Sequence, residues 1–405
     1  MEKDKLLKIN SFFIILLPLA LISGPVIPEI IVFFSFITFL ALKNKINYPI
    51  YKDKVLILFI ILWIYSIIPS ILSIDILYSI KSSSLYFRFI IFSILIYITL
   101  HNNEKLLKNL YYVLLFSFII LFLDSSFQKI FTYNIFGMVT PHKIRISSFF
   151  GDELILGGFM IKFYPILIGL MYFFTKKNFN LFFSLTSLST FITVIISVEK
   201  TAIIIFFIEY FLLFIFLRNK IRIKLLFMVL PIVVLSIFLT FSPKIKLRVY
   251  DQLLSNSENF NYIFTRTHTE HYISSYRIFK DNPIFGVGPK MFRKHCNNKE
   301  YKLSENSCTT HSHNFSMQLL SETGLIGFFI YLCIYILMAK DFFKTLVKKN
   351  YNKYEFLFYS VIILNLINLM PLFPSGSFFN NWLAITYSFP IGLYYYLKNK
   401  IYNLK

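Results

Sequence analysis

The sequence predicts an all-α integral membrane protein with about twelve transmembrane helices. Of its 405 residues, 57% are hydrophobic and 50 are phenylalanine, whereas a soluble domain is about half apolar and about a quarter charged. The mean hydropathy is +0.65. Apolar runs of about 20 residues, each long enough to cross a hydrocarbon core of about 30 Å, recur along the whole chain. The twelve runs are 8–24, 25–42, 55–73, 82–100, 107–123, 154–175, 179–198, 201–217, 224–241, 323–340, 355–372 and 381–397.

The first apolar run resembles a signal peptide, because Ile9 to Gly24 follows Lys3, Lys5 and Lys8. It lacks a cleavage site made of small residues, and a second apolar run follows at once. We therefore predict an uncleaved signal-anchor helix whose N-terminal segment, Met1–Asn10, lies in the cytoplasm.

The chain has a formal net charge of +21, and the positions of its basic residues explain this charge. Lys and Arg cluster at alternate junctions between the apolar runs, which is the distribution that keeps basic loops in the cytoplasm. The clusters lie at 3–8, 43–54, 105–108, 176–177, 218–224, 340–353 and 398–405. This pattern predicts that both termini are cytoplasmic, and it explains the basic balance without a nucleic-acid partner.

Three regions follow from this topology. Residues 1–240 form a bundle of nine spans, residues 241–322 form one large outer loop with short helices, and residues 323–405 supply the last three spans. Two smaller outer segments are 124–153 and the tight turn 197–200. Because the cytoplasmic loops are too short for a catalytic domain, we expect any chemistry on the outer face.

The large loop carries its own helix signal. Tyr262 to Asp281 has helical apolar spacing and ends before Asn282-Pro283, since a residue before proline avoids the α region. Gly286 to Pro289 then reads as a turn. We predict His268 and His271 to be surface residues of the helix.

Arg266 and Arg277 are eleven residues apart, so a helix places both on one face. Glu270 lies one turn from Arg266 and is predicted to pair with it. The alternative to a binding role is a solvated charged face.

Two of the three cysteines fall in the outer loop. Oxidising conditions there favour a disulfide between Cys296 and Cys308. Two free thiols, or a zinc site whose spacing matches no standard pattern, are the alternatives. The zinc ligands would be His295, Cys296, Cys308 and His311, whereas Cys333 lies inside a span and is expected to be inert.

Charged residues inside the spans are costly and therefore point to function. Arg88 and Lys162 are both predicted about two turns below the outer surface, and Glu209 lies in the eighth span. With Arg145 and Lys200 at the outer rim, these cations suit a lipid-linked diphosphate, since guanidinium and ammonium groups pair with phosphate oxygens. In the alternative, Arg88 and Lys162 snorkel to the surface and Glu209 pairs with a helix neighbour.

The most polar junction of the chain is His311 to Gly327, where the large loop meets the tenth span. Titratable groups at such a boundary are expensive to desolvate, so we expect the active site here.

The spacing at this junction resembles a known family. His313-Asn314, nine further residues and then Gly324-Leu325-Ile326-Gly327 resemble the signature of the O-antigen ligase and O-antigen polymerase superfamily of bacterial envelope enzymes. The resemblance extends to Arg266, to 282–288, to the loop 145–153 and to the turn 198–202. Lys200 departs from the arginine usual in that turn, which keeps the charge but loses the planar fork.

The resemblance implies transfer of a glycan from undecaprenyl diphosphate to a sugar hydroxyl on the periplasmic face, without a metal or other cofactor. It implies that Arg266 and Lys200 hold the diphosphate while His313 acts on the acceptor. Asn314 is expected to cap the following helix or to bind a sugar hydroxyl, and Glu153 is a weaker candidate for a polar contact or base. Further predicted diphosphate contacts are Arg145, Arg277, Arg88 and Lys162.

The functional prediction is therefore a bacterial inner-membrane glycosyltransferase, surrounded by membrane lipids, that inverts the anomeric centre. A lipid A–core acceptor would make it a ligase, which the His-Asn-x9-Gly-x-x-Gly match favours slightly, and a second lipid-linked glycan would make it a polymerase. A transporter of lipid-linked oligosaccharides is the rival class, although it needs no outer histidine and its expected inverted repeat is not found. An assembly scaffold without chemistry is a third interpretation.

Overall fold

The computed structural model describes residues 2–42, 49–140, 144–175, 178–216, 221–247, 266–347 and 353–402. Within these ranges the chain is helical, and its extended pairing is limited to an isolated bridge between Tyr133 and Val139. The helices of the first part are α1 (Glu2–Ile22), α2 (Val26–Leu42), α3 (Lys54–Ile71), α4 (Ile76–Ser84), α5 (Phe87–Asn102), α6 (Leu106–Phe131), α7 (Leu156–Phe174), α8 (Phe179–Ser197) and α9 (Lys200–Phe216). The later ones are α10 (Ile221–Phe241), α11 (Pro243–Lys246), α13 (Arg266–Asp281), α14 (Phe292–His295), α15 (Phe315–Val347), α16 (Lys353–Asn368) and α17 (Asn381–Tyr402). Three short 3-10 turns are η2 (Pro49–Lys52), η3 (Ser148–Phe150) and η6 (Glu305–Ser307).

Each of the twelve apolar runs coincides with a helix, the fourth with the pair α4 and α5. Among the described residues, seven helical stretches are long and apolar enough to cross a membrane. They are Asp4–Ile22, Lys54–Ile71, Ile76–Asn102, Leu106–Phe131, Leu156–Phe174, Phe179–Ser197 and Phe315–Val347. The protein is thus an all-helical membrane protein.

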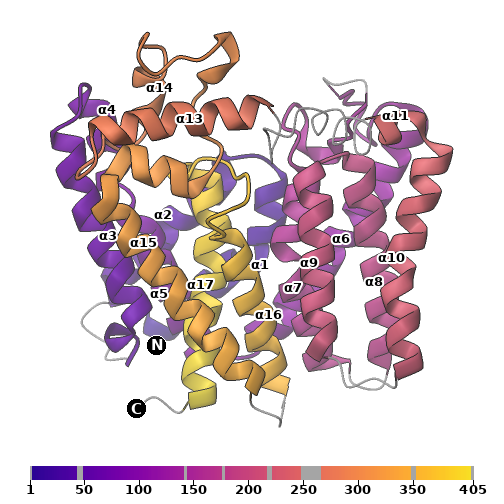
Figure 1. Cartoon of the computed structure of the whole chain (residues 1–405). Helices are drawn as coiled ribbons and strands as arrows, with labels where there is room; N and C mark the ends of the chain where they lie inside the picture. The colour runs from indigo at the N-terminus through magenta and orange to yellow at the C-terminus, as the bar shows by residue number, and fades with distance from the viewer. Residues whose placement is uncertain are drawn as a thin grey trace.

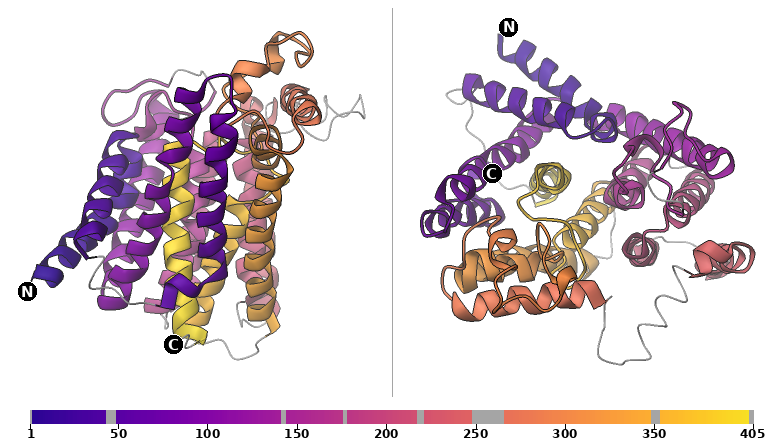
Figure 2. Two further views of the ribbon diagram at one scale, coloured as in Figure 1. Left: turned by 90° about the vertical axis from the view of Figure 1, so that its left-hand side faces the viewer. Right: turned by 90° about the horizontal axis from the view of Figure 1, so that it is seen from above.

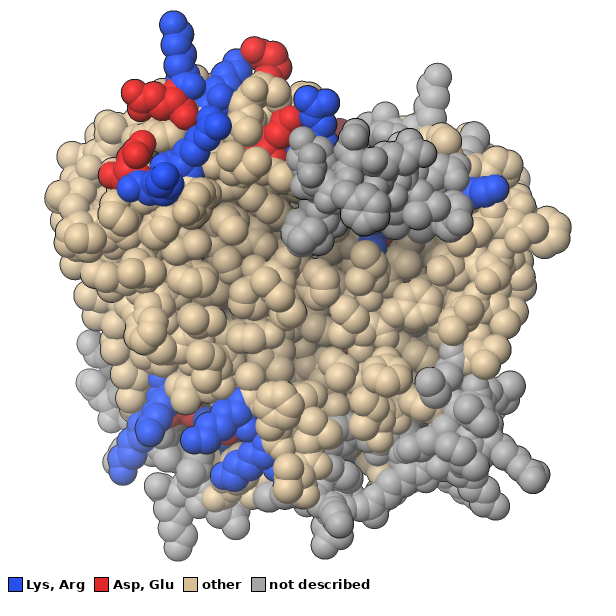
Figure 3. Space-filling view, in the orientation of Figure 1, with Lys and Arg blue, Asp and Glu red and all other residues tan. Residues whose placement is uncertain are grey.

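The helices form an upright bundle with α13 and α14 lying across one end, which we call the loop end (Figure 1). Both termini lie toward the opposite end, as Figure 2 also shows from the side. On the face drawn in Figure 3, the described Lys, Arg, Asp and Glu side chains gather at these two ends and leave a band without charged side chains between them. This arrangement is typical of a protein whose middle faces lipid. The predicted basic residues at 43–48, 176–177, 218–220, 348–352 and 403–405 lie outside the described residues.

The core is built around α16 and α17. Nearly all of α16 is buried, and it packs against α7, while α17 packs against α5. A helix that is apolar all round is suited to such an interior position. These two inner helices hold the bundle on which the loop end rests.

The predicted outer segment 124–153 begins later than expected, because α6 continues to Phe131. Asp124 is buried and accepts hydrogen bonds from the Ile135 backbone N–H (2.8 Å) and from the Ser148 hydroxyl (2.5 Å). A carboxylate satisfied by the returning loop has no need of water, so the charge does not end the helix.

The predicted tight turn at 197–200 is present. Val198 adopts φ 56° and closes α8, and α9 begins at Lys200. Between them, the Glu199 carboxylate accepts hydrogen bonds from the backbone N–H groups of Gly157 (2.8 Å) and Gly158 (3.1 Å). The turn therefore caps the first turn of α7, where the helix leaves N–H groups unsatisfied.

Candidate active site at the loop end of α15

The geometry of the site begins with a break in α15. Gly324 has φ 66° and ψ −169°, so the helix is split into a short upper piece and a long lower piece (Figure 1). The loop 282–288 docks on this break: the Leu325 N–H donates to the Pro283 carbonyl (2.8 Å) and the Val287 N–H donates to the Ser321 carbonyl (2.9 Å). A Cβ on Gly324 would lie 2.1 Å from the Ile284 carbonyl oxygen. Glycine is therefore required for this docking.

The docked loop is itself close to the helix. Gly286 has φ 69°, and a Cβ there would lie 2.5 Å from the backbone of Glu322. The Tyr65 hydroxyl of α3 donates to the Thr323 carbonyl (2.9 Å) on the other side of the break. The glycine motifs at 286–288 and 324–327 thus pack against each other in one interlocked junction. This junction holds the first part of α15, and with it the segment before the helix that carries His313.

Asn314 is the N-cap of α15. Its side-chain oxygen accepts a hydrogen bond from the Met317 N–H (3.0 Å). Both amide hydrogens are used, because the side chain donates to the carbonyls of Pro371 (3.0 Å) and Phe373 (3.1 Å). Of the two predicted roles the structure favours capping over contact with a sugar, since the amide donors are already occupied.

Glu322 is a buried residue that the sequence did not single out. Its carboxylate accepts hydrogen bonds from the Phe292 N–H (3.2 Å) and the Gln318 side chain (2.9 Å). Its backbone carbonyl also accepts from the Gly288 N–H (2.9 Å). Glu322 therefore ties α14 and the docked loop to the upper piece of α15.

His313 precedes this supported helix in a left-handed conformation, with φ 54°. Its carbonyl accepts hydrogen bonds from the Ser375 N–H (2.9 Å) and the Tyr272 hydroxyl (3.4 Å). A non-glycine residue in this region of φ is uncommon and persists only where its surroundings hold it. The half-buried imidazole is thus held in place through its backbone.

The rings of three other histidines lie around that of His313, which makes a group of four. The His313 ring centroid lies 4.1 Å from that of His311, 5.2 Å from that of His271 and 5.4 Å from that of His268. We call this group the histidine cluster. The prediction that both His268 and His271 are surface residues was wrong for His271: α15 packs against α13, so one turn of α13 faces inward and His271 is buried, whereas His268 is half-buried. Helical periodicity alone could not reveal this packing.

Crowding sets the charge state of the cluster. Burial, with the charges of its three histidine neighbours, lowers the pKa of His313 to about 3. Burial, with Arg293 as the next cause, lowers the pKa of His311 to about 4. Both imidazoles are consequently neutral at pH 7, and a neutral imidazole is able to accept a proton. Nε2 of His311 is buried and makes no hydrogen bond among the described residues.

Arg266 is the first described residue of α13 and forms the predicted pair with Glu270, at 3.0 Å. Its side chain is 73% exposed, so most of its hydrogen-bonding surface is open to a ligand. Arg277, further along α13, donates to the Glu300 carbonyl (3.3 Å) at an exposed position. The helix ends at Asp281 as predicted, whereas its expected start at 262–265 lies outside the described residues.

Two further predicted cations lie at the α8–α9 turn. Arg145 donates to the Leu154 carbonyl (2.7 Å) and approaches the Glu199 carboxylate (3.9 Å). The charge of Lys200 contributes, after burial and His271, to lowering the pKa of His268, which places Lys200 close to the histidine cluster. Glu153 is exposed, and its backbone N–H donates to the Phe150 carbonyl (3.0 Å).

The charged residues within the spans have separate environments. Arg88 lies in the first turn of α5 and pairs with Glu29 of α2 at 3.3 Å. Lys162 donates to the Asn368 side chain (2.9 Å). Neither carboxylate oxygen of Glu209 has a hydrogen-bond partner among the described residues, so the predicted pairing with a helix neighbour is not formed.

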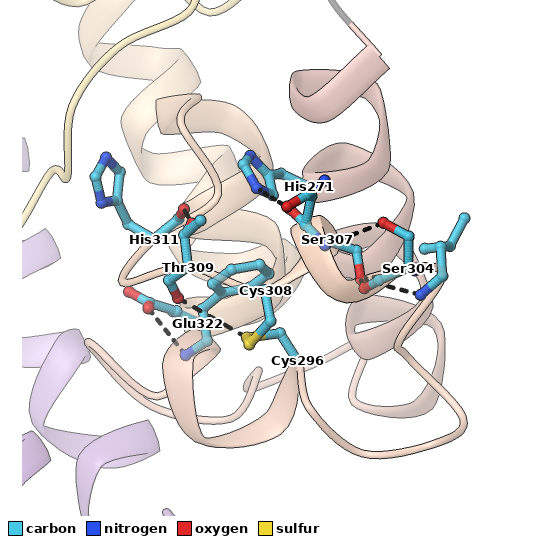
Figure 4. The surroundings of a disulfide bond; sticks show 11 residues. His271, Cys296, Ser304, Ser307, Cys308, Thr309, His311 and Glu322 are labelled. Carbon is cyan, nitrogen blue, oxygen red and sulfur yellow. Dashed lines mark hydrogen bonds between the residues drawn. A yellow bond between two sulfur atoms is a disulfide. The ribbon is translucent and has the colours of Figure 1, made fainter.

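The loop cysteines are joined. Cys296, at the end of α14, forms a disulfide with Cys308, and the two Cα atoms lie 5.1 Å apart (Figure 4). This pairing uses both sulfurs that the zinc alternative required. The disulfide closes the segment that leads from α14 to His311, whose ring points away from it in Figure 4.

Lys290 and Arg293 also belong to this site and were not predicted. Lys290 follows the turn that begins at Gly286, and Arg293 lies on α14 directly after the Glu322 contact. Both are half-buried. Their proximity to the glycine motif was the available signal, but α14 has only 4 residues and no helical periodicity marks it.

Comparison with known proteins gives one family. Residues 185–332 match the family model described as O-antigen ligase, a range that includes α9, α13, α14 and the histidine cluster. The search of curated proteins found no match. Residues 185–332 are therefore a region of the O-antigen ligase type, which confirms the predicted resemblance to the O-antigen ligase and O-antigen polymerase superfamily.

Proposed function

We propose that this protein is a glycosyltransferase of the O-antigen ligase type, which moves a glycan from undecaprenyl diphosphate to a sugar hydroxyl of lipid A–core. The family match supports a membrane glycosyltransferase of ligase or polymerase type. The observation that carries the proposal is the neutral, backbone-held imidazole of His313 at the loop end, whose neighbours His268 and His311 feel the charges of Lys200 and Arg293. A proton acceptor beside cations is what transfer from a diphosphate requires.

The reaction needs one bond to form and one to break. The acceptor hydroxyl oxygen attacks the anomeric carbon, His313 takes the hydroxyl proton, and the bond to the diphosphate oxygen breaks with its electron pair. Direct displacement from the opposite face inverts the anomeric centre. Arg266 and Lys200 stabilise the departing diphosphate, whose charge increases in the transition state.

Substrate binding also tunes His313. With a pKa of about 3, the imidazole is neutral at pH 7 but only weakly basic. A diphosphate placed beside the histidine cluster would raise that pKa, because a nearby negative charge favours the protonated form. The base therefore becomes effective when the donor is present.

The topology forms part of the proposal. We propose twelve spans with cytoplasmic termini in the bacterial inner membrane, so that the loop end faces the periplasm. The regions are 1–240, the catalytic loop 241–322 and 323–405, of which 248–265 lie outside the described residues. The reaction is proposed to need no metal. Additional diphosphate contacts by Arg145, Arg277, Arg88 and Lys162, and a role for Glu153, remain predictions.

A surface-polysaccharide polymerase is the second candidate, because the same histidine and cations would serve a lipid-linked acceptor equally well. A transporter of the same lipids would bind the donor without needing His313.

The test uses purified protein in nanodiscs with undecaprenyl-diphosphate glycan as donor. Lipid A–core and additional donor are offered separately as acceptors, and the wild type is compared with His313→Ala and with His295→Ala, a loop histidine outside the cluster. Glycosylated lipid A–core that is lost only in His313→Ala supports the ligase. If the wild type instead lengthens the lipid-linked glycan, the protein is a polymerase. If the wild type binds the donor but forms no product, glycosyl transfer is rejected.

A further inference from the structure

A second group of basic residues lies beside the histidine cluster, away from the α8–α9 turn. It consists of Arg88, Lys290 and Arg293, and we call it the α14 basic group. Figure 1 shows α4 and α14 on one side of the loop end and α9 on the other. Figure 3 shows basic and acidic side chains together at the surface of that side. The histidine cluster therefore has cations on two sides.

Two observations place the α14 basic group against His311 and Glu322. The Gly288 N–H and the Phe292 N–H both bind Glu322, so the segment that carries Lys290 and Arg293 is fixed to the upper piece of α15. The charge of Arg293 contributes to the lowered pKa of His311. Burial, Arg293 and Arg88 together lower the pKa of Lys290, as expected where cations crowd one another.

The group has more positive charge than its neighbours neutralise. Glu29 pairs with Arg88, and Asp75 pairs with the exposed Lys294 at 3.7 Å. Among the described residues, Lys290 and Arg293 have no ion-pair partner within the same distance limit. The remaining carboxylate, Glu322, is already hydrogen-bonded to the Phe292 N–H and to Gln318.

Unused donors are the independent sign of a ligand. Nε of Arg293 and Nε of Arg88 are both buried and make no hydrogen bond among the described residues. The Arg293 guanidinium is held by stacking over the Tyr78 ring, 5.6 Å from its centroid. A buried N–H without a partner is costly, whereas a guanidinium held in place binds phosphate oxygens well.

The surroundings indicate that the phosphate belongs to a lipid. Arg88 lies within the apolar stretch Ile76–Asn102, which is long enough to cross a membrane. Next to it, α2 and α4 expose aliphatic side chains on the outside of the bundle, including Ile27, Ile30 and Leu77. An acyl or prenyl tail packs against such a surface while its headgroup reaches the cations.

We propose that Arg88, Lys290 and Arg293 bind the phosphate-bearing headgroup of the acceptor lipid, opposite the donor diphosphate at Arg266 and Lys200. Arg88 is then a contact of the acceptor and not of the donor diphosphate for which the sequence suggested it. This inference rests on the proposed function and names the class of acceptor. Both candidate acceptors carry such a group: the phosphates of lipid A–core, or the diphosphate of a second lipid-linked glycan. The histidine cluster then lies between two anionic headgroups, where His313 reaches the acceptor hydroxyl.

The test compares two double variants that each remove two positive charges. Lys290→Gln with Arg293→Gln removes the proposed site, whereas Lys294→Gln with Lys302→Gln is the control, because both of its lysines are in surface ion pairs. We expect the first pair to raise the acceptor KM about tenfold or more, since charge-assisted hydrogen bonds are lost, with kcat and donor affinity nearly unchanged. Lys290→Arg with Arg293→Lys, which restores the charges, should recover most of the affinity.

Binding measurements identify the acceptor without requiring turnover. Undecaprenyl diphosphate and phosphorylated lipid A–core are titrated separately into nanodisc-embedded protein. Loss of lipid A–core binding in the first pair, with one undecaprenyl diphosphate still bound, supports the site in a ligase. A fall from two bound undecaprenyl diphosphates to one supports it in a polymerase.

Unchanged binding of both probes, or equal losses in the control pair, overturns the inference. Equal affinity of the wild type for phosphorylated and dephosphorylated lipid A–core, with a single undecaprenyl diphosphate bound, overturns it as well. The proposed function has a separate failure, the absence of product in the wild type. The two failures are therefore distinguishable.

Discussion

Two of the regions that bury polar side chains, the break in α15 and the surroundings of Glu209, treat them differently. At the break in α15, Asn314, Gln318 and Glu322 are all buried and all hydrogen-bonded to neighbouring backbone or side chains. Between α7, α9 and α16, Glu209 is buried with both carboxylate oxygens unpartnered among the described residues. Among the described residues, Lys162 in that region makes a single hydrogen bond, to the Asn368 side chain.

The difference separates a supported site from an unsupported one. At the α15 break, the groups that position the backbone are satisfied. The atoms left without a hydrogen bond among the described residues include ring nitrogens of His271 and His311, whose rings lie against that of His313, and Nε of Arg293. A preorganised active site needs positioning groups whose hydrogen bonds are all made, and reactive side chains whose polar atoms are still available to the substrate. The region around Glu209 has free polar atoms without such supports, so we do not place chemistry there.

The break itself gives the largest expected effect. Gly324→Ala places a Cβ 2.1 Å from the Ile284 carbonyl oxygen and requires a left-handed φ of a non-glycine residue. We expect the unfolding free energy to fall by roughly 3 kcal/mol or more and glycosyl transfer to be lost as well. Thermal unfolding in detergent measures the stability. Gly158→Ala is the control, because a Cβ there would lie at an ordinary 3.5 Å from the Glu199 carboxylate. A Gly324→Ala protein as stable as this control would contradict the interlocked junction.

A matched pair of glutamine substitutions compares the two regions directly. Glu322→Gln turns an amide NH₂ toward the Phe292 N–H or the Gln318 NH₂, so a donor meets a donor and we expect roughly 1–3 kcal/mol of destabilisation. Glu209→Gln removes a carboxylate that has no hydrogen bond to lose, so stability should change little. Chemical or thermal denaturation of both variants decides the point. A larger loss at Glu209 would mean that its carboxylate supports the bundle despite having no hydrogen bond to any described residue.

The sequence predicted the helices well and the surroundings of the site less well. Apolar runs mark helices because lipid-exposed and buried segments alike exclude charge, and His313 was found through its spacing from Gly324. The extent of α6 was missed because Asp124 is satisfied by a loop more than ten residues away along the chain. His271 and Arg293 were missed because their burial depends on how α13 and α14 pack on α15, which local periodicity does not encode.

Acidification should lower the stability of the protein, through the histidine cluster, before it stops the reaction. The pKa values of His311 and His313 are lowered to about 4 and about 3 in the folded protein, whereas an unfolded histidine titrates near 6.5. Below pH about 6.5 the unfolded chain binds protons that the folded chain does not, so stability is lost as the pH falls from there toward about 4. We expect the Tm to decrease between pH 7 and pH 5, and less so in His311→Gln.

The pH–rate profile tests the same cluster. Since His313 stays neutral at pH 5, the acidic limb of kcat/KM should lie well below pH 6.5 in the wild type. His311→Gln removes the closest histidine and should move that limb upward. A wild-type limb at pH 6.5, unmoved by the substitution, would show that His313 is not the titrating base.

The smallest expected change in stability is that of an Arg266 substitution. This substitution distinguishes most clearly between residues that stabilise the fold and residues that bind the donor. The arginine is 73% exposed, and Glu270 keeps a second partner in the Ser304 hydroxyl (2.5 Å). Arg266→Ala should therefore alter the unfolding free energy by less than about 0.5 kcal/mol, as exposed ion pairs usually do. Its donor KM should nevertheless rise about tenfold, because a charge-assisted contact to the diphosphate is lost. Lys302→Ala breaks a comparable pair with Glu305 on the same loop and should change neither quantity. If Arg266→Ala instead reduces stability and leaves donor KM unchanged, Arg266 belongs with Glu322 among the residues that hold the loop, and the donor diphosphate must be held by the cations at the α8–α9 turn.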